Sequence, residues 1–346
     1  MGGLHVTSLP QEAAKYASAV VVGEGEACWQ KVIRDAERGQ LQKFYGAGEP
    51  SFDLAQAPMP AFELLDISRY NRITVQTSRG CPHRCEFCAS SILLTDKYKQ
   101  KPMAKVLGEI DRILSIWGDP FLEFADDNTF INRRYWKELL PELRKRRVRW
   151  FTETDISVAE DEELLQMMHE SGCAQILIGL ESPVDGGLKG IELRNDWKLR
   201  RRPHYIDAIR KIQSKGITVN GCFVLGLDGQ TPEAFDQVFN FVEESGLYEV
   251  QVTLQTAFPG TPLYERLKRA GRIIEDGCWE KCTLFDINYR PEGMTIDELD
   301  RGFKNLVSRL HSDDFTNWRR TNFRRQFRSA HRTRHSDAAT GAIAVA

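Results

Sequence analysis

The sequence of 346 residues lacks long hydrophobic runs and lacks an excess of either charge. It contains no stretch of about 18 consecutive apolar residues, so we expect no membrane-spanning helix. Its 47 basic and 49 acidic residues leave a formal net charge of −2, which gives no overall attraction to nucleic acid or to an anionic membrane. The opening segment, MGGLHVTSLP, also lacks the basic and apolar regions of a signal peptide. These absences predict a cytoplasmic globular protein.

Cysteine is scarce except at one place. Of the eight cysteines, Cys81, Cys85 and Cys88 lie close together, and the other five lie far from them in the sequence. In a reducing compartment such a cluster binds metal more often than it forms disulfides. A structural zinc site prefers two separated pairs of ligands, and no second C-x-x-C motif is present, although His83 could supply a fourth ligand. The C-x-x-x-C-x-x-C spacing favours three thiolates around one iron–sulfur cube with one iron left open, and zinc or inert thiols are the alternatives.

The middle of the chain, residues 67–290, alternates short apolar runs with amphipathic helical patterns. Six runs predict strands, at 73–76, 121–125, 148–152, 174–179, 217–225 and 250–256. Strands separated by helices are typical of βα units in a parallel sheet. Six are too few for a complete eight-stranded barrel, so the pattern predicts either a partial barrel or a doubly wound sheet. Cys173 and Cys222 flank or lie within these runs, and we expect both to be small core residues.

The first 66 residues contain little that could form a core. One strand-like run (19–22) and one helical pattern (28–38) precede a proline-rich stretch at 49–60, which we interpret as a linker. A single strand and a single helix cannot bury a core alone. This segment must therefore dock on the rest of the protein or be the remnant of a larger domain.

The last part of the chain, residues 291–346, has one more helical pattern at 297–309 and then a tail with seven arginines between Arg319 and Arg334. Aromatic residues are few in this tail, and no binding motif accompanies them. We therefore expect a solvated helix with a disordered end. Contact between the basic tail and nucleic acid is the alternative.

The segment 77–88 resembles the cluster-binding loop of the radical S-adenosylmethionine (SAM) superfamily, which has this cysteine spacing and an aromatic residue, here Phe87, before the last cysteine. The six strands also match the partial (β/α)6 TIM-like barrel of that family. The resemblance implies a [4Fe–4S] cluster held by Cys81, Cys85 and Cys88, whose open iron chelates the amino and carboxylate groups of SAM. One-electron reduction by a partner such as flavodoxin or ferredoxin then cleaves SAM to a 5′-deoxyadenosyl radical, while the protein supplies placement and excludes water.

The same resemblance implies SAM-binding residues at the ends of the predicted strands, where barrel sites lie. Asp126 and Asp127 follow the second strand, where the family commonly has a Gly-Gly-Glu motif that contacts the methionine amine of SAM; here the match is by position only. Glu181 follows the fourth strand. Gly226 lies in a glycine motif of the fifth strand that lets the backbone approach adenine, near which Phe87 is expected to pack. Helix caps and a plain turn are the alternatives for the acids and the glycine.

Two other groups of residues have more than one interpretation. Glu153 and Asp155 end the third strand and are expected either to face SAM or substrate or to cap a helix. Cys278 and Cys282 form a C-x-x-x-C pair near the end of the barrel. Two ligands are too few for an auxiliary cluster unless a distant thiol joins them, so we expect none.

The N-terminal segments 2–7 and 20–26 resemble the last part of the cobalamin-binding domain that precedes the barrel in one radical SAM class. That domain normally holds cobalt with the histidine of a D-x-H-x-x-G motif, and none of the seven histidines lies in such a motif. Cobalamin is therefore disfavoured as a cofactor of this chain. We interpret the segment as the α/β remnant of a truncated or degenerate domain, docked as a structural cap.

The sequence thus predicts an α/β fold in three parts: the remnant and linker (1–66), a partial (β/α)6 TIM-like barrel (67–290), and a C-terminal helical extension with its tail (291–346). The expected function is that of a radical SAM enzyme acting on a small-molecule or lipid-like substrate. The expected reaction is methylation, cyclisation or rearrangement of a lipid, tetrapyrrole or natural product. An RNA-modifying enzyme and a non-catalytic zinc- or cluster-binding protein are the alternatives.

Overall fold

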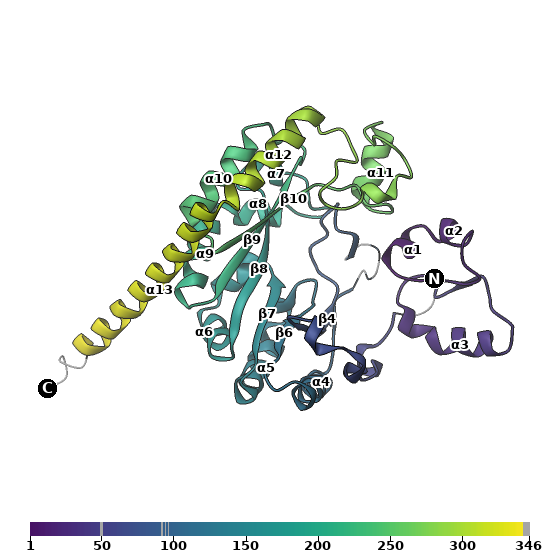
Figure 1. Ribbon diagram of the computed structural model, residues 1–346, viewed down its shortest axis with the longest axis horizontal. Helices are drawn as coiled ribbons and strands as arrows, with labels where there is room; N and C mark the ends of the chain where they lie inside the picture. The colour runs from purple at the N-terminus through teal and green to yellow at the C-terminus, as the bar shows by residue number, and fades with distance from the viewer. Residues whose placement is uncertain (49–50, 91–92, 94, 96, 342–346) are drawn as a thin grey trace.

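Six parallel strands form the main sheet and lie side by side in their order along the chain, β3-β6-β7-β8-β9-β10 (Figure 1). The computed structural model describes residues 1–48, 51–90, 93, 95 and 97–341, with side chains as far as residue 328. The strands are Ile73–Val75 (β3), Phe121–Phe124 (β6), Arg149–Thr154 (β7), Cys173–Glu181 (β8), Thr218–Leu225 (β9) and Glu249–Leu254 (β10). A doubly wound sheet reverses its strand order partway across, whereas this order progresses in one direction, as in a barrel. The sheet is therefore the expected partial barrel, with β3 and β10 at its edges.

Helices cover one face of the sheet, and the other face lines the interior of the partial barrel. The helices that follow the strands are α4 (Met103–Ile116), α5 (Arg133–Arg146), α6 (Glu162–Glu170), α9 (Tyr205–Ser214), α10 (Ala234–Ser245) and α11 (Pro262–Arg269). Along β9, Val219 and Phe223 are fully buried beneath the helices, and Asn220 and Cys222 alternate with them on the inner face. Cys173 is buried as expected, whereas the expectation that Cys222 is a core residue was wrong, because the two-residue period of β9 turns its side chain inward.

The N-terminal segment forms a small α/β unit beside the barrel, coloured purple in Figure 1. It contains α1 (Leu4–Ser8), α2 (Pro10–Ala13), α3 (Trp29–Glu37) and the parallel strands β1 (Val20–Val21) and β2 (Phe44–Tyr45). Val20 is fully buried against Val6 and Ala13. The unit is tied to the segment that follows α11 through Trp279, whose indole N–H donates to the Glu12 carboxylate at 3.0 Å. The strand and the helix expected from the sequence are both present.

Short elements between the strands carry the residues that surround the cysteine segment. Strand β4 (Ser78–Arg79) follows β3 directly and pairs in antiparallel fashion with β5 (Lys99–Gln100), which comes after the cysteines. Two short helices, α7 (Asp185–Leu188) and α8 (Trp197–Arg201), follow β8. None of these four elements has a clear sequence pattern, because each is held by contacts with distant residues.

The C-terminal extension consists of α12 (Ile296–Leu310) and α13 (Asp313–Gly341), and α13 runs along the barrel and past it (Figure 1). The tail is helical as far as the structure describes it, and its Arg319 is fully buried instead of solvated. The Arg319 guanidinium donates to the carbonyls of Tyr248 at 3.0 Å and Leu310 at 3.1 Å, which ties α13 to α12 and to the residue before β10. The next arginine, Arg320, is exposed. Among the described residues, no helix combines the length and the apolar character needed to cross a membrane.

We expect Arg319→Ala to lower the free energy of unfolding by about 2–4 kcal/mol, because the change leaves two carbonyl groups without donors and removes a buried side chain. Urea unfolding followed by circular dichroism measures this loss. Arg320→Ala is the matched control and should change the free energy of unfolding by less than about 0.5 kcal/mol, since its side chain is exposed. Equal effects of the two substitutions would contradict the role assigned to Arg319.

Candidate active site

The three-cysteine segment follows β3 at the carboxyl edge of the sheet. Cys85 is buried and forms an isolated antiparallel bridge with Glu192, in the loop between α7 and α8. Cys81 and Cys88, on either side of it, are partly buried. The segment therefore lies between the ends of the first strands and the region that follows β8.

Asp126, at the carboxyl end of β6, binds the start of this segment. Its Oδ1 accepts the backbone N–H groups of Thr77 at 2.7 Å and Ser78 at 2.8 Å, and its Oδ2 accepts the Thr77 hydroxyl at 2.5 Å. The residue is 3% exposed, and this burial raises the pKa of Asp126 to about 6 although the hydrogen bonds lower it. Both carboxylate oxygens thus hold the backbone that leads into the cysteine segment.

Asp127 holds the same segment at two other points. Its Oδ2 accepts the Gly80 N–H at 2.7 Å, immediately before Cys81, and its Oδ1 accepts the Ser90 hydroxyl, two residues after Cys88. Gly80 has a φ of +89°, a conformation that favours glycine. The two consecutive acids therefore brace the cysteine segment before its first ligand and after its last one.

Asn128 and Asp155 connect β6 and β7 to the first cysteine. Asn128 Nδ2 donates to Asp155 Oδ2 at 2.8 Å and lies 3.9 Å from the Cys81 sulfur. His83 Nε2 lies 3.2 Å from Asp155 Oδ2, and its Nδ1 lies 3.7 Å from Glu192 Oε1. Burial would raise the pKa of Asp155, but hydrogen bonds from His83 and Asn128 hold it well below its usual range. Both ring nitrogens of His83 thus face carboxylates.

Glu181, at the end of β8, forms a buried ion pair that the sequence analysis missed. Lys198 Nζ donates to Glu181 Oε1 at 2.7 Å and to the Gly179 carbonyl at 2.6 Å. Burial would lower the pKa of Lys198, but the Glu181 carboxylate raises it above its usual range and keeps the ammonium charged. This charge also acts on Cys85, where it opposes the burial that raises the pKa of the thiol. The pair therefore places a cation near the middle cysteine.

The backbone at Glu181 is also unusual. Its φ of +61° lies in the left-handed region, which residues other than glycine rarely adopt. The pairing of β8 with β9 shifts register between Gly179 and Glu181. Bulges and backbone strain of this kind collect at functional sites, which supports the prediction that Glu181 belongs to the site.

Glu86, between the second and third cysteines, is bound from α11. Arg266 Nε donates to Glu86 Oε2 at 2.9 Å and Arg266 Nη2 donates to Oε1 at 2.5 Å, a bidentate pair. Arg266 also donates to Asp228 at 2.6 Å, and Asp228 accepts a further bond from Arg272 at 2.7 Å. This network joins the cysteine segment to the ends of β9 and β10. Its partners are too far apart in the sequence to leave a local signal.

Phe87 and Gly226 make contacts within the protein that explain their residue types. Phe87 packs against two small apolar clusters, which include Leu227 and Leu263. Gly226 has a φ of +88°, and a Cβ there would lie 2.6 Å from the Tyr289 hydroxyl, which donates to the Gly226 carbonyl. The fold itself therefore requires glycine at this position.

Glu153, on β7, is exposed on the inner face of the sheet. Partial burial and the nearby carboxylates of Glu123 and Asp127 raise the pKa of Glu153. Within the described part of the chain it has no hydrogen-bond or ion-pair partner, whereas Asp155 accepts the Ser157 N–H at 2.9 Å and caps the following turn. Of the two roles expected for this strand end, Asp155 has the cap, and Glu153 is available to a ligand.

The chemistry of the three thiols fits an iron–sulfur cluster. Burial raises the pKa of Cys81 to about 11 and raises that of Cys85 above its usual range. Thiols in such surroundings stay protonated until a metal supplies the positive charge that thiolates need. Within the described residues, no group of three or more His, Cys, Asp or Glu side chains is placed so that it could hold a single metal ion. Ligands of a cube bind different irons, so they do not have to converge on one point as zinc ligands do.

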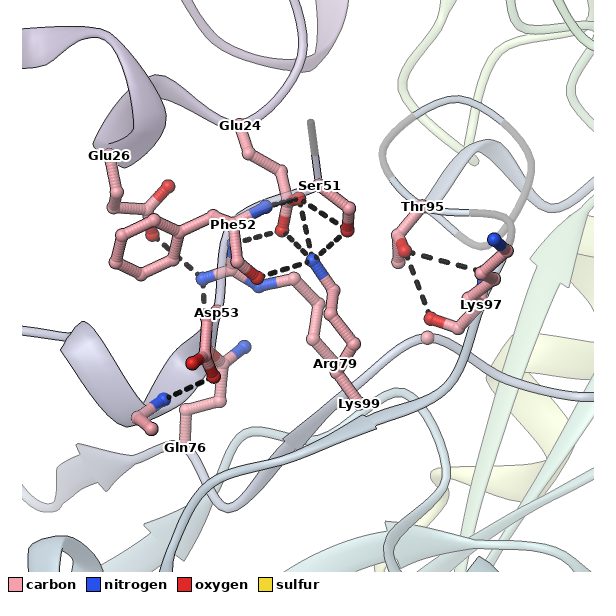
Figure 2. A network of polar contacts seen from close by, with 12 residues as sticks. Glu24, Glu26, Ser51, Phe52, Asp53, Gln76, Arg79, Thr95, Lys97 and Lys99 are labelled. Carbon is pink, nitrogen blue, oxygen red and sulfur yellow. Dashed lines mark hydrogen bonds and ion pairs between the residues drawn. The ribbon is translucent and has the colours of Figure 1, made fainter. Parts of the chain in front are cut away.

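The N-terminal unit contacts the cysteine segment through two glutamates (Figure 2). Arg79, two residues before Cys81, donates to Glu24 at 2.7 Å and to Glu26 at 2.8 Å. Lys99, on β5, donates to Glu24 Oε2 at 2.6 Å. Burial would raise the pKa of Glu24, but these bonds lower it. The β4–β5 strand pair, between whose strands the three cysteines lie in the sequence, is therefore held from outside the barrel.

Comparison with known proteins agrees with this geometry. Residues 75–242 match the radical SAM superfamily, and residues 261–345 match a domain of unknown function, DUF4070. The chain is 30% identical over 285 residues to the hopanoid C-2 methylase of Rhodopseudomonas palustris. The aligned region covers 80% of this chain and 53% of the methylase. It is 25% identical to the bacteriochlorophyllide d C-12(1)-methyltransferase of Chlorobaculum tepidum, over 90% of this chain and 68% of that enzyme.

A solved structure shares the fold. The radical SAM methyltransferase TsrM from Kitasatospora setae, with cobalamin and a [4Fe–4S] cluster bound, superposes with a TM-score of 0.62 at 19% identity, over 78% of this chain and 59% of that chain. The present chain spans about half the length of the hopanoid methylase. The superfamily match includes all three cysteines of the segment and strands β6 to β9. Residues 75–242 of this chain are therefore a radical SAM domain, and members of that superfamily use a [4Fe–4S] cluster and SAM.

Proposed function

We propose that this chain is a radical SAM enzyme that holds one [4Fe–4S] cluster through Cys81, Cys85 and Cys88. The observation that carries the proposal is the bracing of the cysteine segment by Asp126 and Asp127 at the carboxyl edge of a parallel sheet. With the cluster and SAM bound, one-electron reduction by a flavodoxin or ferredoxin supplies a 5′-deoxyadenosyl radical that abstracts hydrogen from a substrate.

The residues of this chain would orient the bound groups and balance their charge. The Lys198 ammonium, buried beside Glu181, favours the thiolate form of Cys85, and the Glu181 carboxylate opposes this effect. The Asn128 amide donates towards the Cys81 sulfur, and hydrogen bonds to ligand sulfurs tune a cluster's reduction potential. Glu153 is a carboxylate on the inner face that has no hydrogen-bond or ion-pair partner among the described residues, and we propose that it meets SAM or substrate.

For the overall reaction we propose methylation or a related rearrangement of carbon in a hydrophobic small molecule. Support comes from the relatives, which are named for methylation of a hopanoid and of a bacteriochlorophyllide. Cobalamin is bound in the TsrM structure, so the N-terminal unit is the part of this chain to examine for it, although its one histidine, His5, does not lie in a D-x-H-x-x-G motif. We also propose the three-part division at residues 66 and 290.

Cys85→Ala is expected to abolish SAM cleavage, because the cluster loses one of its three protein ligands. The full chain would be reconstituted anaerobically with iron and sulfide and reduced with dithionite. 5′-Deoxyadenosine is then measured by chromatography, and bound iron by a colorimetric assay. We expect formation of 5′-deoxyadenosine to fall at least 100-fold and bound iron to drop.

Cys278→Ala is the matched control, since this thiol lies outside the cysteine segment. Bound iron per chain should stay as in the unsubstituted protein. Loss of iron with Cys278→Ala would indicate an auxiliary cluster. Zinc in place of iron and sulfide in the purified protein would contradict the proposed function.

Asp126→Asn and Asp126→Ala separate two roles of this carboxylate. Asparagine keeps an oxygen for the N–H groups of Thr77 and Ser78, whereas alanine removes every acceptor. We expect Asp126→Ala to lower the free energy of unfolding by about 2–4 kcal/mol and to reduce bound iron, while Asp126→Asn retains most of both. If both variants bind the cluster normally but lose SAM affinity in calorimetry, the residue contacts SAM and the bracing role is wrong.

A further inference from the structure

A cavity lies between the proline-rich linker and the free edge of β3. Its volume is about 640 Å3, which is within the usual range of small-molecule sites. Most of its wall is apolar and is formed by Pro58, Pro60, Ala61, Phe62, Leu65 and Ile73. A second cavity of about 800 Å3 shares two wall residues, Glu26 and Pro58, and adds Trp29 and Phe52 on its outer side. The two cavities therefore adjoin at Glu26 and Pro58, and the wall of the second also carries polar side chains, including Gln30, Ser51 and Asp53.

The charged side chains in the wall of the inner cavity neutralise one another. Glu26 accepts a bond from Arg79 at 2.8 Å, as Figure 2 shows. Lys101 and Glu109 form a buried pair at 2.9 Å. Each of the four charged residues of this wall thus has an oppositely charged partner. Such a wall offers no charge to an ionic ligand and suits an uncharged one.

The inner end of the cavity reaches the candidate active site. Its wall there is formed by Thr74, Gln76 and Ala125. These residues alternate with buried ones along β3 and β6, so they lie on the inner face of the sheet. Ala125 and Thr74 are exposed although they lie within the barrel, since the space beside them is open. Ala125 immediately precedes Asp126, which holds the cysteine segment.

We propose that this cavity binds a large, uncharged, mainly apolar substrate of the lipid class and presents it to the inner face of the barrel through the free edge of β3. The inference rests on the proposed function for the reaction that follows. Binding itself depends only on the wall: the apolar surface supplies affinity, and Gln76 is the uncharged polar group at the inner end.

Titration of the full chain with N-phenyl-1-naphthylamine, an uncharged dye that fluoresces in apolar surroundings, tests the inference. We expect saturable binding at one site. Ala61→Trp and Thr74→Trp, which each add a bulky side chain to the cavity wall, should each weaken binding at least tenfold. Ala36→Trp, at an exposed position of α3 outside the cavity wall, is the matched control and should change the Kd by less than twofold. Circular dichroism establishes that each variant is folded.

Equal affinity in all four proteins, or no saturable binding, would overturn the inference. Two variants that fill the cavity, Ala61→Trp and Thr74→Trp, are included so that, if one does not fold, the other still tests the inference. The titration requires neither cluster nor SAM and is repeated with Cys85→Ala, which should bind the dye normally. Dye binding without any SAM cleavage would therefore count against the proposed function alone, and SAM cleavage without dye binding would count against this inference alone.

Discussion

The buried carboxylate of Asp126 is the interaction on which the candidate site depends. A charged group is costly to bury unless it is fully hydrogen-bonded, and here two backbone N–H groups and one hydroxyl satisfy it. Those donors belong to the residues that leave the first strand, so the same bonds fix the direction in which the chain enters the cysteine segment. The next residue, Asp127, accepts hydrogen bonds from Gly80 before the first cysteine and from Ser90 after the last one. The end of the neighbouring strand thus holds the segment on both sides of the three thiols, and the bridge from Cys85 to Glu192 and the ion pair of Glu86 with Arg266 hold its middle.

The six strands and the position of the cysteines could be predicted from the sequence because both have local signals, whereas the choice of a partial barrel over a doubly wound sheet came from the family resemblance. Buried parallel strands appear as short apolar runs, and three cysteines at fixed spacing are visible without a structure. The supporting contacts could not be predicted. Lys198 reaches Glu181, and Arg266 reaches Glu86, only after the chain has folded, so no pattern along the sequence links them. Asp126 was identified by its place at a strand end, but its hydrogen bonds to the backbone of Thr77 and Ser78 were not foreseen.

In the C-terminal tail, the composition predicted the environment of one arginine correctly and that of its neighbour incorrectly. Its many arginines suggested a solvated helix, and for Arg320 that is right. Arg319 differs because its position on the helix turns it towards two carbonyl groups at the ends of other elements. Composition describes the average environment of a residue type, whereas the three-dimensional register decides the environment of a single side chain.

A sheet that does not close has two free edges, and free edges tend to pair with other chains. The short first strand, only three residues long, offers little backbone for such pairing. The prolines that line the space beside it, Pro58 and Pro60, have no N–H group to donate. At the other edge, the Leu254 N–H already donates to the Leu284 carbonyl at 2.8 Å. Both edges of the incomplete barrel thus offer fewer backbone groups for pairing with another chain than fully exposed strands would.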